Sequence, residues 1–403
     1  MTFDGVARRH PDAGHRDVTR VTVPQRVADR LGRSSEAPFS LFPAPASLAD
    51  GEVVCLQSHL LVTVGLAVVD RAAACFRLMA PGECTALDGA WADARLESAR
   101  ALRAAHGLTG PERAYRLLNG AGDRTPGVVA DVFGPWAVVA ALSGALVPTA
   151  QLLAQGMLDR RLARGVVVKH RARGQAAAGP AVVAVLGEAP PERLIVTEGP
   201  WRFEVHLTTG VNVGLFTDMR AERARIASLA AGRRVLNLFA YTGALSVAAA
   251  SGGATHVTSV DLSEGVLAWA RDHFALNGLD AAAHTTVATD VSTYLADAFR
   301  DGQRYDVVLI DPPSFSAARH APFAIDRDYP PIIRDACALI APGGDLWLAS
   351  NTRGYSLAGA VQVAVPPARQ PRLVAEGSLP PDYPTELSDA DARYLQTALL
   401  RLV

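Results

Sequence analysis

The sequence has almost no lysine and no excess of positive charge. Lys169 is the only lysine, and 39 basic residues face 40 acidic ones, which leaves a net charge of −1. Proteins that bind nucleic acid usually carry a basic excess, because contacts to phosphate supply much of their affinity. Arginine, which provides nearly all the positive charge here, can hold phosphate with two hydrogen bonds and stack on bases. The composition is therefore compatible with an RNA partner but does not argue for one.

Patterns typical of metal sites and of secretion are also missing. The only cysteines are Cys55, Cys75, Cys84 and Cys337, and no two of them form a Cys-x-x-Cys pair. No histidines stand at the spacing of a zinc site. We expect no metal, and four reduced, buried cysteines in a cytoplasmic protein. Residues 1–18 lack the apolar core of a signal peptide and predict a disordered lead-in.

One long stretch lacks charge altogether. Residues 132–158 contain no charged side chain and are numerous enough to cross a bilayer. Glycine and proline interrupt the stretch, for example at Gly134, Pro135 and Pro148. We therefore expect a buried strand over Trp136–Leu142, a turn and a helix, and no membrane span.

The chain is long enough for two or three domains. Short β-like runs such as 52–56 and 62–69, separated by turns with proline and glycine, predict a small β-rich domain over 19–110. Helical periodicity marks 90–107, which ends at a glycine. Strand-like and helix-like segments then alternate over 111–199 and predict a connecting α+β domain.

A regular pattern covers 200–403, where apolar runs of strand length alternate with amphipathic helical segments. This alternation predicts an α/β domain with a parallel, Rossmann-like sheet. In such sheets, ligands lie beyond the carboxyl ends of the strands. The predicted strands are Arg234–Phe239, His256–Asp261, His284–Thr289, Tyr305–Asp311 and Asp345–Ser350.

A tight turn follows the first of these strands. Tyr241, Thr242 and Gly243 lead into a helix of small residues. Gly243 would let a ligand approach the backbone, and the helix would offer free N–H donors at its start. The alternative is an ordinary strand-to-helix turn, which needs no ligand.

Carboxylates close the next two strands. Asp261 stands where dinucleotide-binding folds place the acid that accepts hydrogen bonds from ribose hydroxyls. Its alternative role is a helix N-cap, although Ser263 can fill that position. Asp290 closes the third strand and could lie beside an adenine, or it could cap the helix that follows.

The fourth strand ends in Asp-Pro-Pro-Ser-Phe. Asp311 is delivered to the carboxyl edge, Pro312 and Pro313 fix an extended backbone, and Phe315 follows. An acid, a rigid backbone and an aromatic ring can hold a planar acceptor that carries an amine. Enzymes that act on nucleobases draw the base into a pocket of this kind.

Taken together, these segments resemble the class I S-adenosylmethionine-dependent methyltransferases. Within that class, they resemble the bacterial 23S ribosomal RNA methyltransferases that modify cytosine at carbon 5 or guanine at nitrogen 7. Residues 208–220 are similar to the segment that precedes the first strand in that family, with Thr217 where the family has leucine. Residues 119–139 resemble the family's connecting region, and residues 51–83 faintly resemble its N-terminal PUA domain, an RNA-binding barrel. The segments that carry the main resemblance are LNLFAYTG (236–243), VTSVDLS (257–263), WARDHFALNGL (269–279) and DPPSFS (311–316).

The resemblance implies S-adenosylmethionine as cofactor and assigns its contacts. The turn residues 241–243 would line the methionine part, Asp261 would hold the ribose and Asp290 would lie near the adenine. Asp218 and Arg220 would help to close the site, and residues 311–315 would frame the transferred methyl group. The implied cofactor-binding residues are Asp218, Arg220, Phe239, Tyr241, Thr242, Gly243, Asp261, Leu262, Asp290 and Asp311. The implied catalytic residues are Asp311, Pro312, Phe315 and Asn351.

The acceptor is judged from the residues after the fifth strand. Methylation of cytosine at carbon 5 needs a thiolate to attack carbon 6, and the cytosine-modifying relatives carry a cysteine there. This chain has Ser350 and Asn351 instead, and Cys337 lies one helix earlier. The segment 350–356 is more similar to that of the guanine-modifying members. Asn351 would bind the acceptor and Arg353 a phosphate or carboxylate, unless the segment is only an exposed turn.

Ribosomal RNA is therefore the favoured partner, but alternatives stay open. Residues 1–100 hold eleven arginines and twelve acids, and an RNA-binding barrel should not be neutral. A degenerate N-terminal domain could instead serve structure or form a homodimer. The chain would then be a small-molecule or natural-product enzyme, including one that cyclises or cleaves the cofactor, or a non-catalytic binding protein. A dehydrogenase is disfavoured, because the turn at 240–246 has a single glycine in place of Gly-x-Gly-x-x-Gly.

Overall fold

The computed structural model describes residues 18–82, 86–171, 182–210, 212–313, 315–316, 323–387 and 393–403, without the side chains of 315 and 316. Contacts divide the chain into two compact units. The first contains the described residues of Met1–Val196, Val205–Val213 and Pro381–Asp389, and the second those of Thr197–Glu204, Gly214–Pro380 and Ala390–Val403. Within these ranges, no helix combines the length and the apolar character needed to cross a membrane.

The first unit begins with a small sheet whose strands follow the order β1-β3-β4-β5-β2. Strand β1 runs parallel to β3, and the remaining neighbours are antiparallel. Helix α1 (Gln25–Leu31) contributes Val27 and Leu31 to an apolar core on one side of this sheet. The strands are β1 (Thr19–Val23), β2 (Glu36–Pro38), β3 (Val53–Ser58), β4 (Thr63–Asp70) and β5 (Cys75–Pro81).

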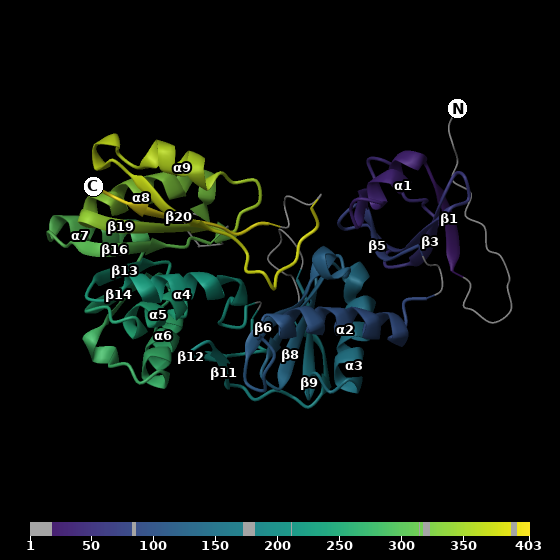
Figure 1. Ribbon diagram of the computed structural model, residues 1–403, viewed down its shortest axis with the longest axis horizontal. Coiled ribbons are helices and arrows are strands. Elements are labelled where there is room, and N and C mark those ends of the chain that lie inside the picture. The colour runs from purple at the N-terminus through teal and green to yellow at the C-terminus, as the bar shows by residue number, and fades with distance from the viewer. Residues whose placement is uncertain are drawn as a thin grey trace. The chain divides into compact units, whose positions relative to one another are not determined.

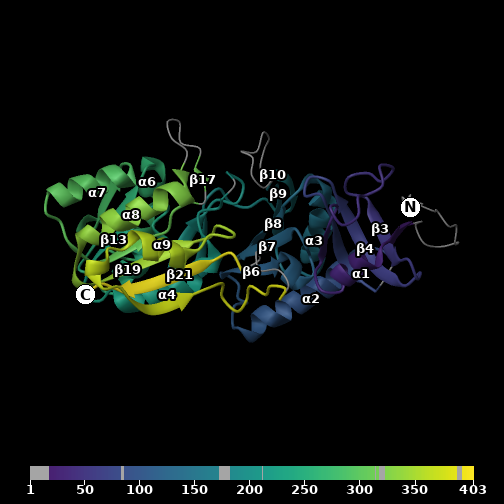
Figure 2. The ribbon, with the colours of Figure 1, turned by 90° about the horizontal axis from the view of Figure 1, so that it is seen from above.

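A second five-stranded sheet of the same unit follows the order β10-β9-β8-β7-β6, which can be followed in Figure 2. Helix α2 (Gly89–Ala105) packs on α3 (Val147–Asp159) and β6. Their core also takes in Leu66 and Met79 from the first sheet. The uncharged stretch therefore forms a buried strand, a turn and a helix, as predicted. The strands are β6 (Ala114–Asn119), β7 (Val128–Phe133), β8 (Trp136–Ala141), β9 (Gly165–His170) and β10 (Val182–Gly187).

The second unit is built on a seven-stranded sheet with the order β15-β14-β13-β16-β19-β21-β20 (Figure 1). Strands β13 to β16 and β19 are parallel, and β21 is antiparallel to both of its neighbours. The five predicted strands are therefore confirmed, whereas the two last ones were not foreseen. The strands are β13 (Arg234–Leu238), β14 (His256–Asp261), β15 (Thr285–Ala288), β16 (Tyr305–Ile310), β19 (Ile340–Ser350), β20 (Arg372–Gly377) and β21 (Gln396–Arg401).

Helices cover both faces of this sheet, as Figure 1 shows. The apolar sides of α7 (Val291–Arg300), α8 (Ile325–Leu339) and α9 (Leu357–Ala364) share one core with the strands. The opposite face carries α4 (Arg220–Leu229), α5 (Ala244–Ser251) and α6 (Glu264–Leu276). This doubly wound architecture is the predicted α/β class. Two short pairs, β11 (Leu194–Glu198) with β12 (Trp201–Val205) and β17 (Phe315–Ser316) with β18 (Phe323–Ala324), accompany it.

The cysteines do not all behave as expected. Cys75 and Cys337 are free and buried. Cys55 is also buried but is disulfide-bonded, so the expectation of a reduced thiol is wrong for this residue. Cys84 lies outside the described residues.

Candidate active site

The strand order of the second unit reverses between β13 and β16. Strand β14 and then β15 follow on one side of β13, and β16 and β19 follow on the other. A reversal of this kind leaves a crevice at the carboxyl ends of the strands, where doubly wound folds bind ligands. The turn after β13, Asp261, Asp311 and Asn351 all come to this edge. The predicted candidates are thus gathered by the sheet itself.

The turn after β13 has an unusual backbone. Phe239 and Tyr241 have φ angles of 58° and 49°, and Gly243 has 73°. For residues other than glycine, the left-handed region costs roughly 1–3 kcal/mol each and is found mostly at functional sites. A Cβ atom on Gly243 would lie 2.7 Å from the Cβ of Ala270 on α6. The close approach of α6 therefore requires a glycine at the start of α5.

Asp261 is tied to this turn. One carboxylate oxygen accepts the backbone N–H of Tyr241 at 2.9 Å, and the other accepts that of Ser263 at 3.1 Å. The side chain is half-buried, and each carboxylate oxygen can accept a further hydrogen bond. Leu262, the next residue, is 65% exposed and offers an apolar surface at the same edge.

Asp290 caps a helix. It precedes α7, and one of its carboxylate oxygens accepts the N–H groups of Ser292 at 2.9 Å and Thr293 at 3.2 Å. The capping role that we considered as an alternative is therefore present. A contact with adenine stays a prediction, which the second carboxylate oxygen could fulfil.

The segment before α4 lies against the turn. The hydroxyl of Thr242 donates to the carbonyl of Gly214 at 2.7 Å, and the rings of Phe216 and Tyr241 lie 5.6 Å apart. Asp218 follows in a short 3-10 helix, and the half-buried Arg220 begins α4. The structure thus brings this predicted segment to the turn.

His273 fixes the turn from the other side, and our sequence reasoning gave it no role. Its Nε2 accepts the N–H of Glu204 at 2.9 Å, which leaves Nδ1 to donate to the carbonyl of Thr242 at 2.9 Å. The ring is fully buried, and burial lowers the pKa of His273. The neutral side chain therefore acts as a bridge between β12 and the turn.

Asp311 follows β16 in an environment that favours its protonated form. Burial, followed by the negative charge of Asp218, raises the pKa of the Asp311 carboxyl to about 7, against the influence of Arg223. Asp218 accepts a hydrogen bond from the hydroxyl of Tyr394 at 2.7 Å. The guanidinium of Arg223 is already engaged by Glu198 at 2.5 Å. A carboxyl that titrates near neutral pH can accept or release a proton under ordinary conditions.

Tyr329 on α8 joins the two strands that lead to the candidate acceptor residues. Its hydroxyl lies 3.1 Å from the carbonyl oxygen of Ile310 and 2.9 Å from that of Ala349. These residues immediately precede Asp311 and Ser350. The side chain is fully buried, and no local sequence signal distinguishes it from an ordinary core tyrosine.

The remaining acceptor candidates differ in their exposure. Pro312 is buried, whereas Asn351 and Arg353 are exposed after β19. The side chain of Phe315 lies outside the described residues, although its backbone pairs with Ala324. Cys337 is buried in α8, and burial raises the pKa of its thiol to about 11. A thiol with that pKa is not a nucleophile at neutral pH.

Residues 144–395 match the family of S-adenosylmethionine-dependent methyltransferases. The chain belongs to this family. The match covers more than half of the chain, and the enzyme is therefore a transferase that uses S-adenosylmethionine. Family, cofactor and reaction class are confirmed as predicted.

Relatives of the enzyme are named for ribosomal RNA. A ribosomal RNA large subunit methyltransferase of Deinococcus radiodurans is 34% identical over 340 residues, which is 81% of this chain and 82% of the relative. Ribosomal RNA large subunit methyltransferase K of Neisseria meningitidis is 39% identical over 193 residues, which is 47% of this chain and 53% of the relative. The crystal structure of SMU.776, described as a methyltransferase, contains SAH; it superimposes with a TM-score of 0.85 at 26% identity and covers 95% of this chain and all of that one.

Proposed function

We propose that the enzyme transfers a methyl group from S-adenosylmethionine to a base of ribosomal RNA, at a guanine nitrogen rather than at cytosine carbon 5. The observation that carries this proposal is Asp311, a carboxyl that titrates near pH 7 at the carboxyl end of β16, followed by two prolines. The name of the Deinococcus radiodurans relative supports ribosomal RNA as the substrate class.

The cofactor would lie along the ends of β13, β14 and β15. Asp261 would accept hydrogen bonds from the ribose hydroxyls, and Leu262 would cover the adenine, whose amine would reach Asp290. The turn from Phe239 to Gly243, whose backbone lies partly in the left-handed region, would hold the methionine part. These residues fit the group: an oriented carboxylate, an exposed apolar side chain and a turn with three positive φ angles are present together. Asp218 and Arg220 would close the site. When bound, S-adenosylmethionine supplies a methyl group made electrophilic by its sulfonium.

The acceptor would be held by Asp311 and Asn351. Ionised Asp311 accepts a hydrogen bond from the amine or ring N–H of the base and can take up a proton at one of its carboxylate oxygens. Pro312 and Pro313 keep its backbone extended, and Phe315 would stack on the base. Catalysis would then come from orientation in a site that excludes water.

The same residues argue against carbon 5 of cytosine. That reaction requires a thiolate beside the base, and Ser350 and Asn351 follow β19 in this chain. Cys337 is buried and its pKa is raised, so it cannot replace the missing nucleophile. A ring nitrogen already carries its lone pair and needs only to be positioned.

The proposed substrate also bears on location and partners. An enzyme that acts on bacterial ribosomal RNA would work in the cytoplasm. The homodimer that we considered for the N-terminal domain stays a prediction.

Mass spectrometry of the reaction products tests the proposal. The protein is incubated with S-adenosylmethionine alone and with ribosomal RNA that lacks large-subunit base methylation. We expect S-adenosylhomocysteine only when RNA is present, together with a methylated guanine. A methylated cytosine would overturn the choice of base.

A small-molecule acceptor is the second candidate, favoured by the near-neutral charge of the whole chain. It predicts S-adenosylhomocysteine or methylthioadenosine without RNA. Weak RNA binding that does not depend on salt concentration would also support a small-molecule acceptor, because phosphate contacts make the affinity for RNA fall steeply as salt is added.

A further inference from the structure

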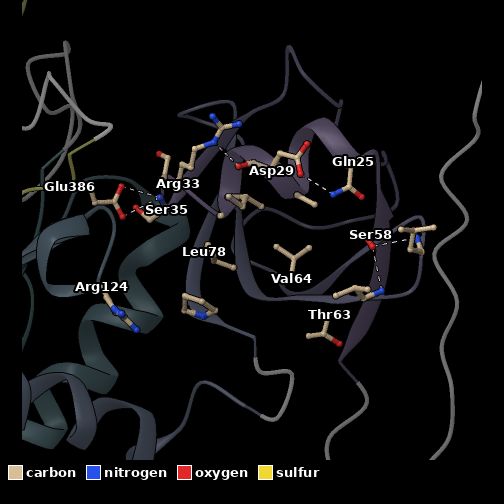
Figure 3. Close-up of a pocket in the computed structure, with 17 residues that line it drawn as sticks. Gln25, Asp29, Arg33, Ser35, Ser58, Thr63, Val64, Leu78, Arg124 and Glu386 are labelled. Atoms are coloured by element: carbon tan, nitrogen blue, oxygen red, sulfur yellow. Dashed lines mark hydrogen bonds between the residues drawn. The ribbon is translucent and has the colours of Figure 1, made fainter.

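A pocket lies in the first unit, apart from the residues assigned to the cofactor. Its volume is about 580 Å³, and α1, the hairpin of β3 and β4, and the C-terminal segment around Glu386 surround it. Figure 3 shows Val64 and Leu78 on its floor, with Arg124 and Glu386 on one side. A concave pocket with apolar residues and a few charged and polar groups is typical of a site for a small ligand.

Glu386 comes to this pocket from far along the chain. Its two carboxylate oxygens lie 3.1 Å and 3.0 Å from the backbone N–H of Ser35, which donates to them. The segment before it is also held: the carbonyl of Pro384 accepts a hydrogen bond from Asn119 at 3.0 Å, and the ring of Tyr383 lies 5.1 Å from the guanidinium carbon of Arg116. The carboxylate is thus anchored but keeps lone pairs for further donors.

Two polar groups of the lining have no partner within the described part of the chain. The hydroxyl of Ser35 is buried in a side chain that is only 7% exposed, and it makes no hydrogen bond there. Buried hydroxyls normally have a partner, and this one belongs to a residue of the pocket lining. Arg124 is exposed, with a φ of 56°, and neither a hydrogen bond nor an ion pair of its side chain is found among the described residues. An acceptor, a hydroxyl and a cation therefore border one apolar floor.

We propose that this pocket binds a guanine nucleotide, with the base on the floor and its Watson–Crick edge at Glu386. Guanine presents two adjacent N–H donors on that edge, which a carboxylate can accept together. Adenine and cytosine present one amine beside an acceptor, which a carboxylate repels. Ser35 would bind a further polar atom of the base, and Arg124 would bind the phosphate.

The nucleotide can be an unpaired residue of an RNA chain or a free one. Unpaired bases are the usual targets of proteins that read RNA sequence, through stacking and edge contacts. RNA as the source rests on the proposed function. The pocket would then hold a second guanine of the substrate, outside the site of methyl transfer.

Calorimetric titration of the full chain tests this assignment. The ligands are GMP, AMP and short unpaired RNAs that differ by one guanine or adenine, each with saturating S-adenosylmethionine present. We expect the guanine ligand of at least one pair to bind at least tenfold more tightly than its adenine counterpart. Glu386→Gln should remove this preference, because the amide keeps one acceptor for Ser35 but sets a donor against the guanine edge. Arg124→Ala should weaken both members of a pair alike.

Matched controls and the opposite outcomes make the test decisive. Glu376→Gln and Arg304→Ala change exposed residues of the second unit and should leave binding unchanged. Equal binding of guanine and adenine ligands, or a guanine preference that survives Glu386→Gln, overturns the proposal. Binding of GMP that occurs only when S-adenosylmethionine is left out also overturns it, because GMP would then occupy the cofactor site. Arg124→Ala changes an exposed side chain, so the loss of affinity for GMP can still be measured if Glu386→Gln proves unstable.

The two proposals fail separately. If GMP binds more tightly than AMP but the guanine-containing RNA binds no more tightly than its adenine counterpart, the pocket stands as a guanine site. Its ligand is then a free nucleotide. The opposite case is one in which no guanine preference is found in binding, and Glu386→Gln still methylates guanine in ribosomal RNA as the unaltered protein does. That result rejects the pocket as a nucleotide site and leaves the proposed reaction intact.

Discussion

The carboxylate of Asp261 accepts the backbone N–H of Tyr241 at 2.9 Å, and this bond joins the end of β14 to the strained turn after β13. The acid therefore orients the turn and, in our proposal, holds the cofactor ribose. Two segments that are separate in sequence become one binding surface through this bond.

Replacement of Asp261 should disable cofactor binding. Asp261→Ala removes the acceptors for the ribose hydroxyls and for Tyr241, and hydrogen bonds to charged groups are worth about 1.5–3 kcal/mol each. We expect the dissociation constant for S-adenosylmethionine, measured by calorimetry, to rise by about 100-fold or more. Glu264→Ala, an exposed acid at the start of α6, is the control. Unchanged affinity in Asp261→Ala would remove this carboxylate from the site.

Gly243 tests the close packing of the turn. Gly302 has a similar φ of 70° but open space around its Cβ position, so Gly302→Ala should cost only the backbone strain of about 1–2 kcal/mol. Gly243→Ala meets Ala270 in addition and should lower the free energy of unfolding by more. It should also weaken the binding of S-adenosylmethionine. Equal losses of stability in the two variants would show that the contact with α6 is unimportant.

The raised pKa of Asp311 predicts the pH dependence of the reaction. The carboxyl has a raised pKa of about 7, so it is protonated below that pH and ionised above it. If the ionised form binds the acceptor, kcat/KM should increase as the pH rises through about 7 and then level off. Asp218→Asn removes the neighbouring negative charge, lowers the pKa of Asp311 and should move the inflection to lower pH. A profile that is flat from pH 6 to 8, or one that Asp218→Asn does not shift, contradicts this role.

Tyr329 is predicted to be a positioning residue. Tyr329→Phe removes the hydroxyl that lies beside the carbonyls of Ile310 and Ala349, and should cost about 1–3 kcal/mol of stability. Because Ile310 directly precedes Asp311, we expect kcat to fall by about tenfold, with the affinity for S-adenosylmethionine unchanged. Tyr305→Phe is the control: its hydroxyl contacts Tyr294 and Gln303 at the opposite end of β16. A similar loss of kcat in both variants would mean a general effect on stability.

Much of the second unit could be predicted from local patterns. Apolar runs of strand length identified β13, β14, β15, β16 and β19, and the rule that ligands lie at strand ends selected Asp261 and Asp311. The strands β20 and β21 were missed because their sequences do not state which strand each will join. The same pattern could not distinguish an adenine contact from a helix cap at Asp290, since an aspartate before a helix serves both.

The sequence alone thus determined the fold class, the identity of the cofactor and the strand ends at which the chemistry is expected. These features depend on periodicity and on short motifs. Tertiary structure decided which groups act on one another. His273 reaches Thr242, Tyr329 lies beside two strand ends, Asp218 raises the pKa of Asp311, and Glu386 is anchored at Ser35. Each of these relationships joins residues distant along the chain. Their distance and burial, which set the strength of hydrogen bonds and charges, exist only once the chain has folded.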